Sequence, residues 1–341
     1  MLPRTQIIDN FLADSGWANA RRVVLAGDAS FRRYERVFLS DRQAVLMDAP
    51  PEKEDVRPFM RAGELLRKSG LNPPQVLASD VVHGLLLLED LGDDLYSHVL
   101  RKNPEQEEAL YIAAADVLVE LYRQAGDADY SEFLPYDHAL LMKEGGLLSE
   151  WFLPAVSEEK ELNILQAEYT AIWQKLFKSN PALRPVFVLR DYHADNLLWL
   201  PERPGVKRVG LLDFQDAVIG SPAYDMVSFL EDARRDVQVS TVERVLGYYL
   251  EHTEIKRNDF LTAYALLGAQ RNCKIIGIFV RLAVRDGKRQ YLSYLPRVWK
   301  LLEGDLQHPL LEPLKEWMDK VIKPELRGVI PLKTQVIQAA G

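Results

Sequence analysis

The chain has 341 residues, a net charge of −8 and 48% hydrophobic residues, the composition of a globular protein with a sizeable core. It contains no long basic run, which argues against nucleic acid as the main partner, because phosphate backbones reward clustered Lys and Arg. Its longest apolar runs, such as Leu85–Leu88, fall far short of the roughly 20 residues that cross a bilayer. The first twenty residues lack the apolar core of a signal peptide. We expect a cytoplasmic protein that does not bind membranes.

The N-terminal part of the chain favours strands. Residues 56–66 have the spacing of a helix, and Gly70 is expected to end it. We predict an antiparallel sheet of about five strands with one helix against it, forming a lobe over residues 1–91. Three segments are rich in β-branched and aromatic residues, as strands are: residues 21–27, 34–40 and 43–49. Residues 74–80 and 84–90 are interpreted as two more strands.

Beyond Glu89–Gly92, the expected junction, the pattern becomes helical over a lobe of residues 92–341. Asn103, Pro104 and Gln106 form a capping-box arrangement, which predicts a helix start. The single cysteine, Cys273, sits in an apolar helical pattern, so we expect a buried thiol. Further helices are predicted over residues 136–152, 157–178, 221–235, 239–251, 256–284, 287–303 and 310–322.

Between these helices, polar side chains flank two short apolar runs, residues 196–200 and 209–212. Asp191 and Asn196 lie on a turn between short strands, and Asp213 ends the next strand. A hairpin would direct the three side chains into one space, where their oxygens suit a hard cation such as Mg²⁺. Each residue alone is as common in an ordinary turn, so the linked set carries the prediction.

The stretch Val188–Asp225 resembles the aminoglycoside phosphotransferase branch of the protein-kinase-like fold. Asp191-x-x-x-x-Asn196 followed by Asp213-Phe214 resembles its catalytic loop and metal-binding segment. Gly220–Asp225 resembles the Gly-Asp-Pro-x-x-Asp motif that follows. The resemblance implies an α+β, bilobal protein-kinase-like fold with a small antiparallel β lobe and a larger helical lobe. It also implies ATP as co-substrate and Mg²⁺ as cofactor.

Within this branch, residues 45–59, 189–202 and 210–220 resemble the bacterial anomeric amino-sugar kinases of peptidoglycan recycling. The resemblance implies ATP-dependent phosphorylation of N-acetylmuramate and N-acetylglucosamine to the 1-phosphate. Asp191 then accepts or orients the proton of the sugar hydroxyl, and Asn196 and Asp213 hold Mg²⁺ against the β- and γ-phosphates. Asp225 is expected to brace the catalytic loop.

The resemblance further implies that backbone groups of Glu89 and Leu91 read the adenine. Met47 stands where the family has a third-strand lysine, and Glu64 is the expected helix partner of that cation. Lys53, Arg32 or Arg33 would have to reach the phosphates instead. The turn expected to cover the phosphates supplies Asp28, Ala29, Ser30, Phe31 and Arg32.

The acceptor is expected beside Asp191. Sugars require polar partners and often an aromatic face, and an arginine could pair with the lactyl carboxylate of N-acetylmuramate. Each of these side chains fits a solvated helix face or a core position equally well. The candidates are His193, Asp195, Asp216, Glu150, Trp151, Arg234 and Arg271.

Three other functions stay open. An aminoglycoside, choline or homoserine could be the acceptor, with an acidic patch of Asp216, Glu231 and Asp232 for a cationic molecule. The missing lysine is compatible with a non-catalytic nucleotide-binding scaffold. His193, Asp195 and His252 could form an iron facial triad, which requires a jelly roll, whereas residues 196–252 carry a mainly helical pattern.

Overall fold

A computed structural model describes residues 2–25 and 31–328 of the chain, which form two compact units. The first, here called the sheet unit, is drawn from Met1–Val117 and Ala194–Ala217. The second, the helical unit, is drawn from Leu118–His193 and Val218–Gly341. These units are defined by contacts between residues and do not test the predicted lobes, residues 1–91 and 92–341, which stay a prediction.

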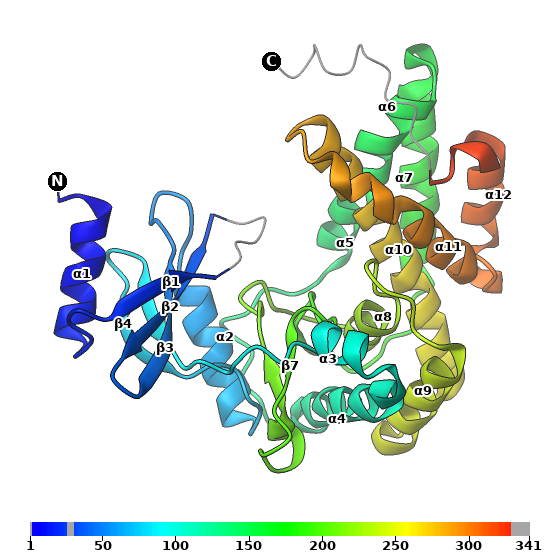
Figure 1. Cartoon of the computed structure of the whole chain (residues 1–341). Coiled ribbons are helices and arrows are strands. Elements are labelled where there is room, and N and C mark those ends of the chain that lie inside the picture. Colours follow the sequence, from blue (N-terminus) through cyan, green and yellow to red (C-terminus); the bar gives the residue numbers. More distant parts are fainter. Residues whose placement is uncertain (1, 26–30, 329–341) are drawn as a thin grey trace. The chain divides into compact units, whose positions relative to one another are not determined.

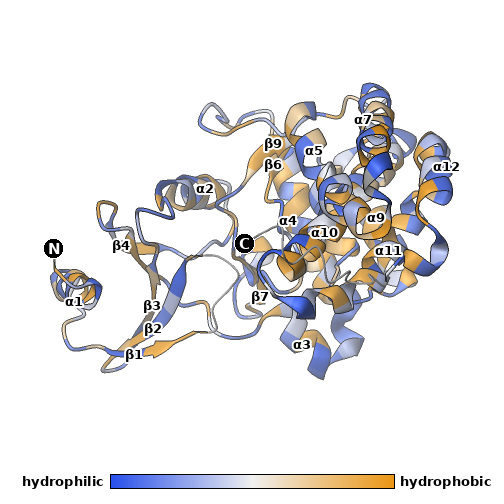
Figure 2. Ribbon diagram, turned by 90° about the horizontal axis from the view of Figure 1, so that it is seen from above, coloured by the Kyte–Doolittle hydropathy of each residue, from blue (hydrophilic) through white to orange (hydrophobic). Residues whose placement is uncertain are grey.

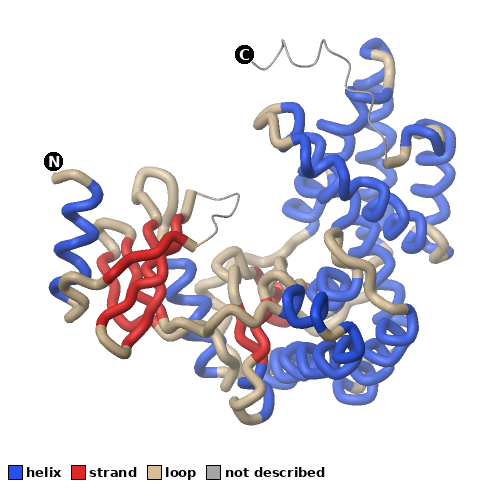
Figure 3. The backbone as a smooth tube through the Cα atoms, viewed as in Figure 1, coloured by secondary structure: helices blue, strands red, loops and turns tan. Residues whose placement is uncertain are grey.

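The sheet unit contains a five-stranded antiparallel sheet in the order β1-β2-β3-β5-β4 (Figures 1 and 3). Arg36 pairs with Val45 across β2 and β3, and Met47 pairs with Tyr34 and Leu86. Directly opposed residues share a face of a sheet, so these five side chains lie on one side. The predicted strands are confirmed: β1 (Arg21–Val24), β2 (Arg33–Leu39), β3 (Arg42–Asp48), β4 (Val76–Asp80) and β5 (Leu85–Leu88).

The other face of the sheet is covered by α1 (Arg4–Asp14), a helix that the sequence analysis did not predict. Its buried Ile8, Phe11 and Leu12 belong to one apolar cluster with residues of β2, β3 and β5, among them Val37 and Leu46. The expectation of a single helix in this part of the chain is therefore wrong. The apolar residues of α1 are buried because they pack on the sheet, a contact that the sequence of the helix alone does not reveal.

The predicted helix at residues 56–66 is confirmed as α2 (Arg57–Lys68), which lies on the opposite side of the sheet from α1 (Figures 1 and 2). It ends before Gly70, whose φ of +73° is a conformation that glycine adopts without strain. Phe59 of α2 stacks on Phe214 with ring centroids 4.7 Å apart. The segment that carries Asp213 therefore packs against α2.

The predicted hairpin is confirmed as β7 (Leu197–Trp199) paired with β8 (Val209–Leu211) in the sheet unit. After α3 (Tyr96–Lys102), residues Pro104–Gln106 form a 3-10 turn, and α4 (Glu107–Gln124) follows. The side chain of Asn103 makes no capping hydrogen bond there. The predicted capping box is therefore wrong, although a helix does follow.

The helical unit contains the helices predicted beyond residue 136, many of them banded in both hydropathy colours in Figure 2, as expected where one side is buried. Cys273 of α10 is buried, and burial raises the pKa of its thiol to about 12. The iron facial triad would require a jelly roll, with residues 196–252 mostly in strands. Helices α8 and α9 lie in this region, so that interpretation is wrong. The helices are α5 (His138–Gly145), α6 (Leu153–Val156), α7 (Leu162–Lys178), α8 (Ala223–Leu230), α9 (Val239–Thr253), α10 (Arg257–Val284), α11 (Leu295–Asp305) and α12 (Glu312–Val321).

One prediction about the central stretch is wrong. Strand β6 (Val186–Val188), which precedes Asp191, pairs with β9 (Val218–Gly220) and not with β7. Asp191 thus belongs to the helical unit, whereas Asn196 and Asp213 border the hairpin of the sheet unit. The three side chains do not come from a single β-turn-β element. Among the described residues, no helix has the length and apolar character needed to cross a bilayer.

Candidate active site

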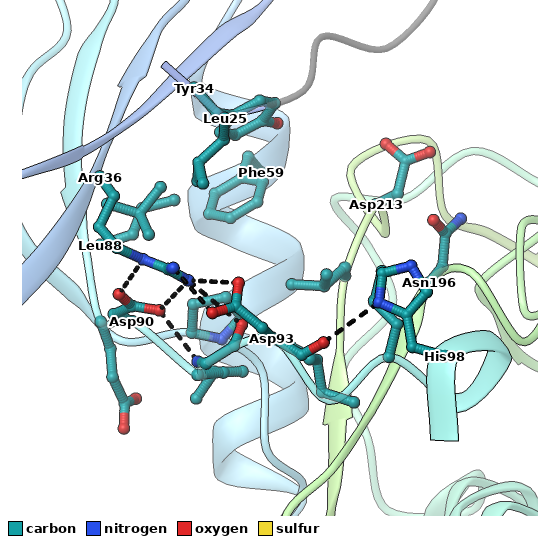
Figure 4. A pocket seen from close by; sticks show the side chains of 18 residues that line it. Leu25, Tyr34, Arg36, Phe59, Leu88, Asp90, Asp93, His98, Asn196 and Asp213 are labelled. Atoms are coloured by element: carbon teal, nitrogen blue, oxygen red, sulfur yellow. Dashed lines mark hydrogen bonds and ion pairs between the residues drawn. The ribbon is translucent and has the colours of Figure 1, made fainter. Parts of the chain in front are cut away.

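A pocket of about 370 Å³ lies within the sheet unit (Figure 4). Its size falls in the range of small-molecule sites. Apolar side chains from the residue after β1 and from β3, α2, β5 and the hairpin form most of its wall, and charged groups line the rest. The apolar residues include Leu25, Val45, Phe59, Leu88, Leu198 and Leu212, and the polar ones include Arg36, Asp90, Asp93, His98, Asn196 and Asp213.

The segment after β5 offers the pocket backbone groups. The N–H of Glu89 donates to the carbonyl of Gln75 at 2.8 Å. In the described part of the chain the Glu89 carbonyl accepts no hydrogen bond, so it can accept one from a ligand. Leu91 is 7% exposed, and its N–H makes no hydrogen bond within the described residues. A buried N–H without a partner is costly, so a ligand acceptor fits there. Adenine reading by Glu89 and Leu91 stays a prediction.

Arg36 is a pocket residue that the sequence analysis missed. Its Nε lies 2.6 Å from Asp90 Oδ2, and its Nη1 and Nη2 each lie 2.9 Å from an oxygen of Asp93 (Figure 4). These bonds tie β2 to the segment after β5, and the bond from Arg36 lowers the pKa of Asp93. Strict alternation along β2, counted from Tyr34, could have placed Arg36 on the pocket side.

Asn196 and Asp213 both line this pocket (Figure 4). The backbone N–H of Leu212 donates to the carbonyl of Asn196 at 3.0 Å, which joins the two ends of the hairpin. Asp213 has a φ of +56°, and one carboxylate oxygen accepts a hydrogen bond from Gln215 at 2.9 Å. The left-handed backbone at Asp213 is a local strain of the kind found at ligand sites.

The donor set fits Mg²⁺. A carboxylate and an amide oxygen are hard ligands, and Mg²⁺ usually takes one or two protein groups plus phosphates and waters. No cluster of three or more His, Cys, Asp or Glu side chains suited to a metal occurs in residues 2–25 and 31–328. A cation at Asn196 and Asp213 would therefore need its remaining ligands from a bound molecule and water.

In the helical unit, a set of hydrogen bonds holds the loop that leads to Asp191. The carboxylate of Asp225 accepts the backbone N–H groups of Leu189 at 2.6 Å and Arg190 at 2.8 Å. Ser228 Oγ donates to the carbonyl of Arg190 at 3.1 Å. Arg190 has a φ of +70°, a conformation that needs such support. This is the arrangement that a bracing role for Asp225 requires; the role itself stays a prediction.

The surroundings of this loop shift the pKa values of Asp191 and Asp225 in opposite directions. Burial raises the pKa of Asp191, but the positive charges of Lys274, His193, Arg271 and Arg190 outweigh it, so the pKa lies below its ordinary value. Asp191 is therefore ionised at neutral pH, as a proton acceptor must be. For Asp225, burial raises the pKa to about 7, although the two N–H donors act in the opposite direction.

Lys274, the cation with the largest effect on Asp191, is held by its own partners. Its Nζ lies 2.9 Å from Glu144 Oε2 and 3.4 Å from the hydroxyl of Tyr224. Glu144 also pairs with the guanidinium of Arg190. Two of the positive charges near Asp191, those of Lys274 and Arg190, are thus fixed in place by a buried carboxylate on α5.

The acceptor candidates fall into both units. Arg234 is exposed, and its Nη1 lies 3.4 Å from Nε2 of the buried His193. Arg271 is buried and donates to Ser228 Oγ at 2.9 Å. The remaining candidates are Glu150 and Trp151 in a π-helical turn of the helical unit, and Asp195 and Asp216 in the sheet unit.

Of the turn residues predicted to cover the phosphates, Asp28, Ala29 and Ser30 lie outside the described residues. Phe31 is 62% exposed, with Lys53 Nζ 5.3 Å from its ring centroid. Met47 is buried on the side of the sheet that Val45 shares.

The expectation that Glu64 pairs with a cation at the pocket is wrong. The Glu64 side chain is 61% exposed and lies 2.8 Å from Lys68 Nζ, one turn further along α2. The inward side of this helix is occupied by other residues, which include Phe59, Ala62, Gly63 and Leu66.

Sequence comparisons extend over nearly the whole chain. The profile of the phosphotransferase enzyme family matches residues 22–260. An N-acetylmuramate/N-acetylglucosamine kinase of Caulobacter vibrioides is 37% identical over 351 residues, covering 93% of this chain and 96% of the relative. A protein of the same name from Pseudomonas aeruginosa is 37% identical over 309 residues, covering 86% of each chain.

Solved structures share the fold at lower identity. A choline/ethanolamine kinase family protein from Mesorhizobium loti has a TM-score of 0.63 and 12% identity, covering 93% of this chain and 100% of its own. The aminoglycoside phosphotransferase APH(2″)-IIa, in its streptomycin–ATP complex, has a TM-score of 0.60 and 15% identity, covering 91% and 98%. The predicted α+β, protein-kinase-like fold is confirmed. With the family profile matched over most of its length and relatives above 30% identity, this chain belongs to the phosphotransferase enzyme family and is a phosphotransferase.

Proposed function

We propose that the protein is an ATP-dependent kinase that phosphorylates the anomeric hydroxyl of N-acetylmuramate and N-acetylglucosamine, in cytoplasmic peptidoglycan recycling. The observation that carries this proposal is the 35–37% identity to four relatives named as kinases of these two sugars, over 80–93% of the chain. The solved structures of choline and aminoglycoside kinases named above are only 12–15% identical.

The sheet unit would bind ATP. Its apolar pocket suits the adenine ring, with the carbonyl of Glu89 and the N–H of Leu91 as hydrogen-bond partners. Asn196 and Asp213 would hold Mg²⁺, which when bound neutralises charge on the phosphates. Positioning and charge neutralisation account for most of the catalysis in phosphoryl transfer, because the transition state is loose.

Asp191 would orient the anomeric hydroxyl and accept its proton. In this reaction the anomeric oxygen forms a bond to the γ-phosphorus, and the bond from that phosphorus to the β–γ bridging oxygen breaks. ADP leaves, and the proton passes from the hydroxyl to the Asp191 carboxylate. The lowered pKa of Asp191 keeps it ionised but makes it a weak base. An anomeric hydroxyl is more acidic than an ordinary alcohol, so a weak base is sufficient.

The acceptor contacts belong to the same proposal. Arg234 is exposed beside His193, which makes it a better partner for the lactyl carboxylate of N-acetylmuramate than the buried Arg271. An arginine suits this group because its planar fork binds a carboxylate through two parallel hydrogen bonds. The other proposed contacts are Asp195, Asp216, Glu150 and Trp151.

A substrate screen tests the proposal. Purified protein is mixed with ATP and Mg²⁺, and ADP release is followed over amino sugars, free sugars, aminoglycosides, choline and homoserine, with Asp191→Ala as the inactive control. We expect the largest signal with N-acetylmuramate and N-acetylglucosamine, and a product that mild acid hydrolyses, as it does sugar 1-phosphates. A preference for an amine-bearing acceptor would overturn the substrate assignment. ATP binding without phosphate transfer to any of these compounds would favour the alternative of a non-catalytic nucleotide-binding scaffold.

A further inference from the structure

Arg32 lies at the edge of the candidate nucleotide site. It stands one residue before β2, and the alternation of side chains along that strand places it with Tyr34 and Arg36, which line the pocket. Its Nη1 lies 3.6 Å from Asp213 Oδ1, and its Nε lies 3.8 Å from Glu54 Oε2. Its side chain is only 11% exposed. The same alternation places the adjacent Arg33 on the opposite face of the sheet, and Arg33 is exposed.

The distances between Arg32 and its two carboxylates are longer than those of direct hydrogen bonds. At these distances the guanidinium forms ion pairs with Asp213 and Glu54, so its position is set by two carboxylates. Glu54 and Asp213 come from segments far apart in the sequence, one before α2 and the other after β8. Asp213 is also a proposed Mg²⁺ ligand, so a cation beside it lies next to the proposed position of the phosphates.

Neither of the positions expected to supply the cation and its partner does so. Met47 carries no charge and is 1% exposed, with Tyr34 and Leu86 as its neighbours across the sheet. Glu64 faces solvent and pairs with Lys68. A cation one residue before β2, with an acidic partner before α2, is the alternative that the described residues offer.

We propose that Arg32 binds the α- and β-phosphates of the nucleotide and that Glu54 holds its side chain, replacing a third-strand lysine and its helix partner. This inference rests on the proposed function only for the identity of the ligand, a nucleoside di- or triphosphate. An arginine suits the task because its planar fork reaches two phosphate oxygens at once and keeps its charge when partly buried.

The direct test is binding without turnover. The affinities of ADP, AMP and adenosine are measured by calorimetry in the absence of Mg²⁺ for the wild type, Arg32→Met and the matched control Arg33→Met. We expect Arg32→Met to weaken ADP binding by about 10- to 100-fold, the effect of losing a charged hydrogen-bonding partner. Adenosine affinity should stay within about twofold, and AMP should fall between the two. Arg33→Met should leave all three affinities unchanged.

Two further variants keep the test decisive. Arg32→Lys retains the charge without the fork and should recover part of the ADP affinity, even if Arg32→Met folds poorly. Glu54→Gln should weaken ADP binding by a few-fold, since it frees the arginine without removing it. Equal losses for ADP and adenosine in Arg32→Met, or an ADP loss in Arg33→Met as large as that in Arg32→Met, would overturn the assignment. An absence of sugar phosphorylation by the wild type would instead refute the proposed function and leave this result standing.

Discussion

The charged residues of the pocket and those of the loop before Asp191 are organised differently. At the edge of the pocket, Arg32 and Asp213 form an ion pair at 3.6 Å, and both keep part of their surface exposed. Around the loop, Asp225 and Ser228 are buried and their oxygens contact the backbone directly. The difference indicates that Arg32 and Asp213 stay accessible to a ligand, whereas Asp225 and Ser228 support the chain.

The largest expected effects come from the carboxylates that would act on the substrates. Asp191→Asn and Asp213→Asn should each lower kcat by about 10³-fold or more, in keeping with losses of general-base and electrostatic groups. Asp191→Asn should leave ADP affinity unchanged, because it removes only the proton acceptor. Asp213→Asn should abolish the strengthening of ADP binding by Mg²⁺. Steady-state kinetics and calorimetry with and without Mg²⁺ distinguish the two, and wild-type turnover in either variant would contradict the mechanism.

Asp225→Ala tests the supporting group. The substitution removes the carboxylate that accepts two backbone N–H groups of the loop. The value of kcat should therefore fall by about 100-fold while ADP affinity is kept. Asp236→Ala is the control, because Asp236 is an exposed carboxylate that pairs with Arg297. A variant with normal kcat would show that the loop does not depend on Asp225.

The same residue predicts a pH dependence. Because burial raises the folded-state pKa of Asp225 from 3.8 to about 7, the folded state binds this proton more tightly than the unfolded state does. The free energy of unfolding should therefore fall as the pH rises from about 4 to about 7, by up to roughly 4 kcal/mol, and stay level above. Urea titrations across this range measure the slope, which should flatten in Asp225→Ala. An unchanged slope would assign the effect to other groups.

Arg36→Met addresses the pocket without touching the phosphates. The loss of its ion pairs with Asp90 and Asp93 should loosen the segment of Glu89 and Leu91, which we propose to bind adenine. We expect KM for ATP to rise by about three- to tenfold with kcat little changed, since partly exposed ion pairs contribute modestly. Arg22→Met, which breaks pairs with Asp9 and Glu35 elsewhere on the sheet, should leave KM unchanged. Equal effects in both variants would point to general loosening of the sheet.

Lys274→Met should have the smallest effect, a shift in a pH profile. It removes the cation that most lowers the pKa of Asp191, so that pKa should rise. The acid limb of kcat/KM should consequently move to higher pH by a fraction of a unit to about one unit. Lys175→Met, on an exposed position of α7, is the control. A limb that stays in place would show that another group governs it.

Sequence reasoning succeeded where the pattern is local. Local composition identified the five strands of the sheet, helical spacing identified α10, and the linked motif placed Asn196 and Asp213 in what proved to be one pocket. The pairing of β6 with β9 was not readable, because a three-residue strand carries little information about its partner. The ion pair of Arg32 with Glu54 was equally hidden, since it depends on how the segment before α2 returns to the sheet.

Helix α1 has a practical consequence for work on this protein. The family profile begins at residue 22 and therefore omits the segment that closes the back of the sheet. In a protein trimmed to the matched region, Val37, Leu46 and Leu87 would lose the helix that covers them. An apolar face of the sheet would then be exposed to solvent. We expect a protein that retains the first seventeen residues to keep that surface covered, and the shortened version to aggregate.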